Sequence, residues 1–182
     1  SWRNPRGLTW TVVQHLYRAM TEWTNWAGNQ HARPASIVRP HSTDEIRDVV
    51  SRAQGRVRAV GAGHSFTGAA LTDGVLVQLD HLTGIESVTA GPDGTTDVTV
   101  RAGTRLHTLN DLLHARGLGL TNMGDIDVQT LAGAISTGTH GTGARFTGLS
   151  AQVVAARLVL ADGTEVTVSD GPLFECARLG LG

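Results

Sequence analysis

The sequence lacks lysine and has only one cysteine, one tyrosine and two methionines among its 182 residues. The single cysteine, Cys176, excludes an internal disulfide and a thiolate metal cluster. All 15 positive charges are arginines, which nearly balance the 16 acidic residues and leave a formal net charge of −1. Because no long basic run occurs, the sequence gives no electrostatic basis for binding nucleic acid, and we expect no such partner.

Long hydrophobic runs are also missing. No stretch approaches the roughly 18 apolar residues of a membrane-spanning helix, and the first residues lack the charged-then-apolar layout of a signal peptide. These absences argue against membrane association and favour a cytoplasmic location. With 40% apolar and 17% charged residues, the chain can bury one substantial core or two small lobes that share one.

Short strands and amphipathic helices follow one another along the chain. Ser42 and Glu45 form a capping box at the start of a helix that ends near Gly55. Gly103-Thr104 caps a second helix, which Gly117 ends. The buried face of this second helix is expected to be Leu106, Leu109, Leu112 and Leu113. Strands are expected at 36–39, 56–60, 75–79, 85–88, 97–101, 153–160 and 165–168.

The first 26 residues carry a different pattern. Val13, Leu16, Met20 and Trp23 recur at helical spacing, which predicts a short amphipathic helix. Such a helix either packs on its own domain or docks on a membrane surface or a partner. Its polar residues include too few positive charges for a lipid anchor, so packing is the favoured interpretation.

The chain is organised around a glycine-rich turn that follows the strand at 56–60. Gly61 and Gly63 allow a tight turn and a close approach to another molecule, and His64 lies at its mouth. The turn is not a dinucleotide fingerprint, because Phe66 stands where the third glycine or alanine is required. It is not a P-loop either, because no Lys-Ser/Thr follows it. A tight turn with a surface histidine remains the alternative.

A second glycine-rich stretch, at 124–143, lies about 60 residues further on. Thr130 to Ala134 could open a helix whose small residues let backbone amide groups meet a diphosphate, with the helix dipole behind them. Leu131 and Ile135 are large apolar residues among the small ones, which suggests that they anchor the segment in the core. The alternative is a glycine-rich surface loop. The eight histidines show no His-Glu-x-x-His motif or paired spacing, so no metal site is expected.

Together, Val60-Gly-Ala-Gly-His-Ser65 and the 124–143 stretch resemble the PCMH-type FAD-binding domain of the vanillyl-alcohol-oxidase superfamily. Within it they look most like the sugar-1,4-lactone and alditol oxidases, the gulonolactone and arabinonolactone oxidase family. The resemblance implies an α+β fold of two α/β lobes with FAD between them. The lobes would be 31–103 and 104–182, after an N-terminal extension at 1–30.

Members of that family continue into a further strand and a substrate-binding cap domain. We therefore expect this chain to be the cofactor half of a larger enzyme, which associates with the C-terminal part of the same protein. The catalytic base belongs to the cap domain in the family, so no catalytic residue is assigned here.

The resemblance also implies a set of cofactor contacts. His64 matches the histidine that bonds covalently to the 8α-methyl carbon of the flavin, and the lack of cysteine in 123–143 implies a single attachment. Further FAD contacts would come from two groups of residues. The first is Ala59, Val60, Gly61, Ala62, Gly63, His64 and Ser65; the second is Gly124, Asp125, Thr130, Gly133, Ala134, Ile135, Ser136 and His140.

The reaction that the resemblance implies is oxidation of a CH–OH group in a sugar lactone or polyol by hydride transfer to the flavin, with oxygen or another electron acceptor. Two alternatives remain open. One is a noncovalent FAD reductase of the same superfold, of the enolpyruvyl-glucosamine reductase type. The other is a non-catalytic nucleotide-binding module.

Overall fold

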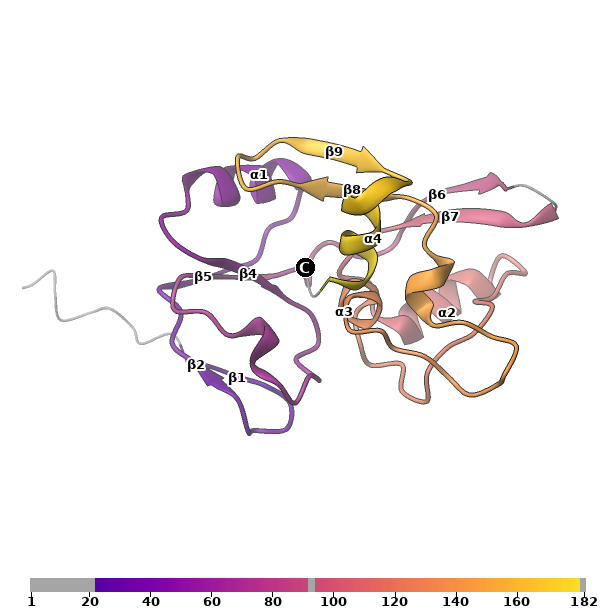
Figure 1. The fold of residues 1–182 in the computed structure, drawn as a ribbon, viewed down its shortest axis with the longest axis horizontal. Coiled ribbons are helices and arrows are strands. Elements are labelled where there is room, and N and C mark those ends of the chain that lie inside the picture. Colours follow the sequence, from indigo (N-terminus) through magenta and orange to yellow (C-terminus); the bar gives the residue numbers. More distant parts are fainter. Residues whose placement is uncertain (1–21, 92–93, 181–182) are drawn as a thin grey trace, which may run out of the picture.

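Four helices and four small sheets build the part of the chain that the computed structural model describes, residues 22–91 and 94–180 (Figure 1). In chain order the elements are β1 (Trp23–Thr24), β2 (His31–Ala32), β3 (Ser36–Val38), α1 (Thr43–Arg52), β4 (Val57–Val60), β5 (Val75–Gln78), β6 (Ile85–Ala90), β7 (Thr96–Val100), α2 (Leu106–His114), α3 (Leu131–Ser136), β8 (Ala156–Val159), β9 (Glu165–Val168) and α4 (Gly171–Leu179). Short 3-10 turns occur at Gly68–Ala70 and Leu149–Gln152.

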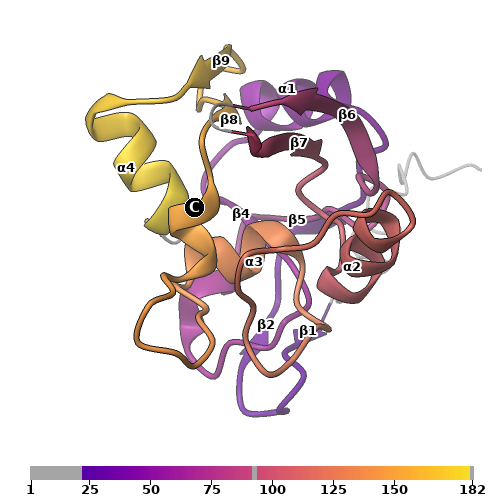
Figure 2. The same cartoon turned by 90° about the vertical axis from the view of Figure 1, so that its right-hand side faces the viewer.

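A three-stranded parallel sheet in the order β3-β5-β4 carries the first glycine-rich turn. Parallel strands are usually covered on both faces and are therefore apolar throughout. Accordingly, the central strand β5 buries Leu76 and Val77 almost completely. In both views α1 lies on one side of this sheet and the β1-β2 hairpin on the other (Figures 1 and 2). The turn after β4 therefore leaves the sheet at its carboxyl edge.

Helix α1 begins as the sequence predicts. The Ser42 hydroxyl accepts a hydrogen bond from the amide of Glu45 at 3.2 Å, which satisfies one free donor of the first turn. The Glu45 carboxylate accepts from the amide of His41 at 2.8 Å, one residue before the cap, so the capping box is shifted at this position. None of the apolar residues of α1 is fully buried.

Helix α2 is confirmed, but its N-cap is Arg105 and not Gly103-Thr104. The Thr104 hydroxyl is instead fully buried, where it accepts from the amide of Gly84 at 2.9 Å and donates to the carbonyl of Arg101 at 2.6 Å. Leu106, Leu109 and Leu113 are buried as expected, whereas Leu112 is only half-buried. Gly117 has a φ of +69° and closes the C-terminus of the helix.

Near both ends of the described chain, the structure differs from the elements that the sequence predicted. Trp23 lies in β1, where it pairs with Ala32, so it does not continue a helix. Residues 1–21 lie outside the described residues, and the amphipathic helix predicted there stays a prediction. At the other end, α4 had no counterpart among the expected elements. It starts after Asp170, has Pro172 in its first turn and buries Phe174.

The second glycine-rich stretch is anchored in a core of its own. Leu106 of α2, Ala134 of α3 and Leu149 are buried together, with partly buried apolar residues packed around them. Helix α4 packs against α3, and the Leu179 side chain approaches Gly138. Figures 1 and 2 both place α3 beside α4 and close to the end of β4. The core therefore fixes the second stretch next to the first.

The β6-β7 hairpin forms no ladder with the parallel sheet within the described residues. It is linked to the later part of the chain, because Glu86 forms ion pairs with Arg101 of its own hairpin region and with Arg157 of β8. The division into lobes 31–103 and 104–182 stays a prediction. None of the helices in the described part of the chain has the length and apolar character needed to cross a membrane.

Candidate cofactor site

The turn after β4 offers a row of free backbone donors. Residues 61–65 follow directly from β4, and Gly63 adopts a φ of +69°, which glycine alone adopts at low cost. None of the amide groups of residues 62–65 donates to an acceptor in the described part of the chain. Successive free amide groups of this kind form a concave site for anions and carbonyl oxygens.

Residues 25–30 hold this turn from outside the sheet. The Trp26 amide donates to the carbonyl of Gly63 at 2.9 Å, and the buried Asn25 side chain donates to the carbonyl of Ser65 at 2.9 Å. Asn29 and Gln30 donate in the same way to the carbonyl of Phe66, at 3.1 and 3.2 Å. We call residues 25–30 the brace.

The brace also contacts the side chain of His64. The indole of Trp26 stacks on the imidazole, with ring centroids 4.9 Å apart and an interplanar angle of 22°. His64 itself is half-buried. A Cβ atom on Gly63 would lie 3.3 Å from the ring of Trp23 and 3.7 Å from the backbone of Asn25 and Trp26, so the lack of a side chain here favours close packing of the turn against β1 and the brace.

The two glycine-rich stretches meet at Gly61. A Cβ atom on Gly61 would lie 2.1 Å from the hydroxyl oxygen of Thr130. Thr130 is 2% exposed and caps α3, since its hydroxyl accepts from the amide of Gly133 at 3.2 Å. The absence of a side chain at Gly61 therefore allows the turn to lie against the start of α3.

The amide groups at the start of α3 already have acceptors within the chain. The amide of Leu131 donates to the carbonyl of Thr104 at 2.8 Å, and that of Ala132 donates to Ala102 at 3.1 Å. The amide of Gly133 is taken by the Thr130 cap. These three donors are used within the chain, and the role of Thr130 and Gly133 as cofactor contacts stays a prediction. The amide groups of residues 62–65, in contrast, donate to no acceptor within the described part of the chain.

The other residues predicted from the second stretch are spread over several environments. Ala134 is fully buried, and Ile135 packs beside it in the core. Gly124 is buried against the side chain of Thr139 and the backbone of His140, whereas the Asp125 and His140 side chains are exposed. One ring nitrogen of His140 lies 2.9 Å from the carbonyl oxygen of Gly141. Their roles as cofactor contacts, like that of Ser136, stay predictions.

Two effects favour the neutral form of His64. Partial burial lowers the pKa of its imidazole below the ordinary value near 6.5, and the positive charge of Arg105 lowers it further. Arg105 is held by the carbonyl of Val128 at 2.9 Å and by Asp80 at 3.6 Å. A neutral imidazole keeps one ring nitrogen free as a nucleophile.

The lowered pKa of His64 predicts a pH dependence of stability. Because the folded state binds a proton less readily than the unfolded chain, His64 costs stability as the pH falls from about 6.5 towards its folded pKa, and costs nothing above that range. Urea unfolding of the wild type and of His64→Gln between about pH 5 and pH 7.5 should therefore show the wild type losing stability relative to the variant at the acidic end. A difference that stays constant with pH would contradict the lowered pKa.

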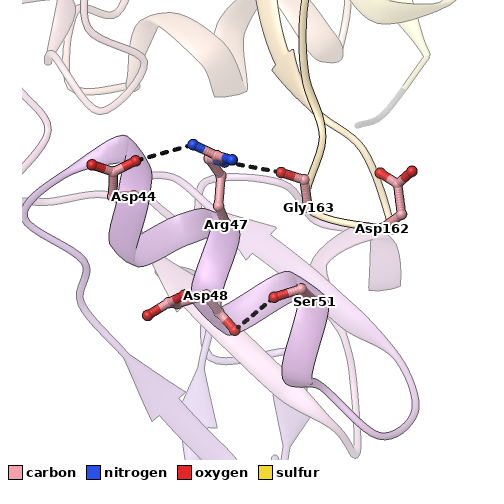
Figure 3. Close-up of a pocket in the computed structure, with 6 residues that line it drawn as sticks. All are labelled: Asp44, Arg47, Asp48, Ser51, Asp162 and Gly163. Atoms are coloured by element: carbon pink, nitrogen blue, oxygen red, sulfur yellow. Dashed lines mark hydrogen bonds and ion pairs between the residues drawn. The ribbon is translucent and has the colours of Figure 1, made fainter.

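A polar hollow of about 340 Å³ lies elsewhere, between α1 and the β8-β9 turn (Figure 3). Its lining is Asp44, Arg47, Asp48, Ser51, Asp162 and Gly163. The Arg47 guanidinium spans it, donating to the carbonyl of Gly163 at 3.0 Å and to Asp44 at 3.2 Å. None of residues 61–65 lines this hollow, so it is separate from the glycine-rich turn. The Arg47 hydrogen bond across it links α1 to the β8-β9 turn.

The fold is shared with solved structures of cholesterol oxidase. The chain superposes on cholesterol oxidase from Brevibacterium sterolicum with a TM-score of 0.73 at 20% identity, covering 88% of this chain and 34% of that one. A second cholesterol oxidase structure from the same organism gives a TM-score of 0.77 at 19% identity. At this level of identity the likeness concerns the fold alone, and it confirms the expected α+β architecture.

Residues 34–169 match the FAD binding domain family, and the chain belongs to that family. It is 47% identical to L-gulono-1,4-lactone dehydrogenase from Mycobacterium tuberculosis over 88% of this chain and 37% of that protein. It is 40% identical to D-arabinono-1,4-lactone oxidase from Yarrowia lipolytica, over 86% of this chain and 31% of that protein. It is 35% identical to L-gulonolactone oxidase from mouse, over 92% of this chain and 39% of that protein. The chain thus spans about a third of these relatives, and the resemblance inferred from the two stretches is confirmed.

The residues present fit FAD. The cofactor brings a diphosphate and ring carbonyl groups that need donors, and the amide groups of residues 62–65 are free donors within the described part of the chain. Gln78, which pairs with Val60 at the end of β5, has a buried side-chain oxygen without a partner among the described residues. A buried acceptor left unpaired at this edge is consistent with a site that a ligand completes.

Proposed function

We propose that this chain is the FAD-binding part of an oxidoreductase that oxidises the CH–OH group of a sugar lactone or a polyol. The observation that carries the proposal is the turn at 61–65. It combines free amide donors with a half-buried histidine of lowered pKa, and it lies against the start of α3. The identity to lactone dehydrogenases and oxidases supports the choice of substrate class.

We further propose that His64 carries the flavin covalently. When bound, the flavin supplies the two-electron chemistry of the reaction. The amide groups of residues 62–65 bind the cofactor, Gly61 lets the turn close on Thr130, and His64 presents a neutral ring nitrogen to the flavin. The catalytic base, the electron acceptor and the C-terminal part with which this chain would associate lie outside these residues. The cytoplasmic location stays a prediction from the sequence.

The proposed function predicts that lactones reduce the flavin. The complete natural polypeptide that contains this chain, mixed without oxygen with L-gulono-1,4-lactone or D-arabinono-1,4-lactone, should lose its visible flavin absorbance. The same experiment with xylitol tests the polyol alternative. Reduction by NADPH but by none of these compounds would instead support the noncovalent reductase. A protein that never contains flavin would favour the non-catalytic module.

A further inference from the structure

Trp26 is exposed to an extent that packing does not explain. Two-thirds of its surface, 67%, is accessible, yet its indole stacks on His64. Large aromatic side chains normally contribute by being buried, and an exposed one next to a functional group needs a reason. The sequence patterns did not assign a role to this residue.

Hydrogen bonds fix the two segments that carry the stacked rings, the brace with Trp26 and the turn with His64. Trp26 is tied to the turn through its amide, which donates to the carbonyl of Gly63 directly before His64. Asn25 organises the other side of the brace, because its side chain accepts from the amide of Gln30 at 3.0 Å and donates to Asn29 at 2.8 Å. The indole and the imidazole are therefore carried by two segments that are bound to each other.

We propose that Trp26 is a positioning residue for flavin attachment: its indole holds the His64 imidazole in the orientation that presents a ring nitrogen to the cofactor. This inference rests on the proposed covalent link. With the indole on one face, the imidazole can offer a ligand only its other face and its edge. Fewer orientations of the nucleophile raise the rate of attachment without changing its chemistry.

The attachment balances as follows. A C–H bond of the flavin 8α-methyl group and the N–H bond of the imidazole are broken, and a C–N bond forms. The two electrons pass into the flavin ring and from there to dioxygen, which takes up both protons to give hydrogen peroxide. Trp26 takes no part in the electron transfer, and its effect is on the orientation of the imidazole.

An electrostatic effect of Trp26 on His64 would raise the pKa of the imidazole and so oppose the attachment. The face of an indole attracts a cation and would favour the protonated imidazole. The lowered pKa of His64 has two causes, partial burial and Arg105, and the contact with Trp26 is a parallel stack of the two rings. The indole therefore serves to orient the ring, and a flat aromatic replacement should keep most of this effect.

The test compares Trp26→Ala and Trp26→Phe with the wild type. Flavin-free protein is mixed with FAD, and samples are acid-denatured over time to measure the flavin that stays with the pellet. FAD that is bound before denaturation is measured in parallel by filtration. We expect Trp26→Ala to bind FAD normally but to attach it at least about tenfold more slowly, and Trp26→Phe to recover most of the rate. Phe146→Ala, which removes another exposed aromatic side chain, should behave as the wild type.

A second readout does not depend on flavin. The ring current of the indole should shift the NMR signals of the His64 ring protons in the flavin-free wild type, and this shift should disappear in Trp26→Ala. If Trp26→Ala attaches FAD at the wild-type rate, or loses FAD binding and attachment together, the positioning role is wrong although the covalent link stands. If the wild type attaches no flavin, the covalent link fails and this inference fails with it, whatever the NMR shift.

Discussion

His64→Ala is expected to remove all of the flavin that survives denaturation. In the wild type, acid precipitation should leave flavin absorbance in the protein pellet, and intact mass should show an increase equal to one FAD. The variant should show neither, because alanine has no nitrogen that could form the bond. The effect is all-or-none, since no cysteine in 123–143 could supply a second attachment.

The variant should still bind FAD before denaturation. The free amide groups of residues 62–65 belong to the backbone, and the brace holds the turn through backbone carbonyls. Neither depends on the imidazole. Filtration of the native variant should therefore retain flavin, and this separates loss of the covalent link from loss of the site.

His114→Ala is the matched control. His114 is an exposed histidine in the last turn of α2, outside both glycine-rich stretches. It should keep the full amount of acid-resistant flavin. A wild type that releases all of its flavin on denaturation would sink the covalent proposal and bring the noncovalent reductase forward. Acid-resistant flavin in His64→Ala would mean that another residue forms the bond.

Local patterns predicted most of the secondary structure. The Ser42 cap, the strand before Gly61 and the two hairpins are encoded by neighbouring residues, and they are confirmed. The two-residue strands β1 and β2 are too short to show a period in the sequence. Helix α4 had a readable start, since Asp170 precedes Pro172 in its first turn, but Gly171 obscured it.

The site was only half predictable, because its contacts are not local. The two glycines and His64 stand out in the sequence, since such residues in a row after a strand are typical of a ligand-binding turn. The side chains of the brace, 36 to 40 residues away, donate to the backbone carbonyls of Ser65 and Phe66, which directly follow His64. Hydrogen bonds of this kind leave no period or spacing.

Non-local contacts also occur at the start of α3. The small residues after Thr130 correctly indicated a helix start that needs close backbone contact. The sequence did not reveal that the partners are the carbonyls of Ala102 and Thr104, which come from the segment before α2. The close approach is therefore protein against protein at this point.

Gly61→Ala should destabilise the fold by about 1–3 kcal/mol, the usual cost of overpacking. Its methyl group would lie 2.1 Å from the Thr130 hydroxyl oxygen. Thr130 cannot simply turn away, because it is buried and its hydroxyl caps α3. Urea unfolding of the purified variants measures this loss. Gly119→Ala is the matched control, since a methyl group there meets no atom within 4 Å and should change stability little.

The substitution Thr130→Ala tests whether the clash with the Thr130 hydroxyl causes the loss of stability in Gly61→Ala. Alone, it removes the cap and should cost about 1 kcal/mol. In the double variant the oxygen that clashes is absent, and the nearest remaining atom is the Cβ of residue 130, at 3.3 Å. The double variant should therefore lose clearly less stability than the sum of the two single losses. Because the sign of the coupling depends on Gly61 and Thr130 touching, additive losses would mean that the two glycine-rich stretches do not meet in solution. In that case the start of α3 would not contact the turn at 61–65, and the proposed site would consist of the turn and the brace alone.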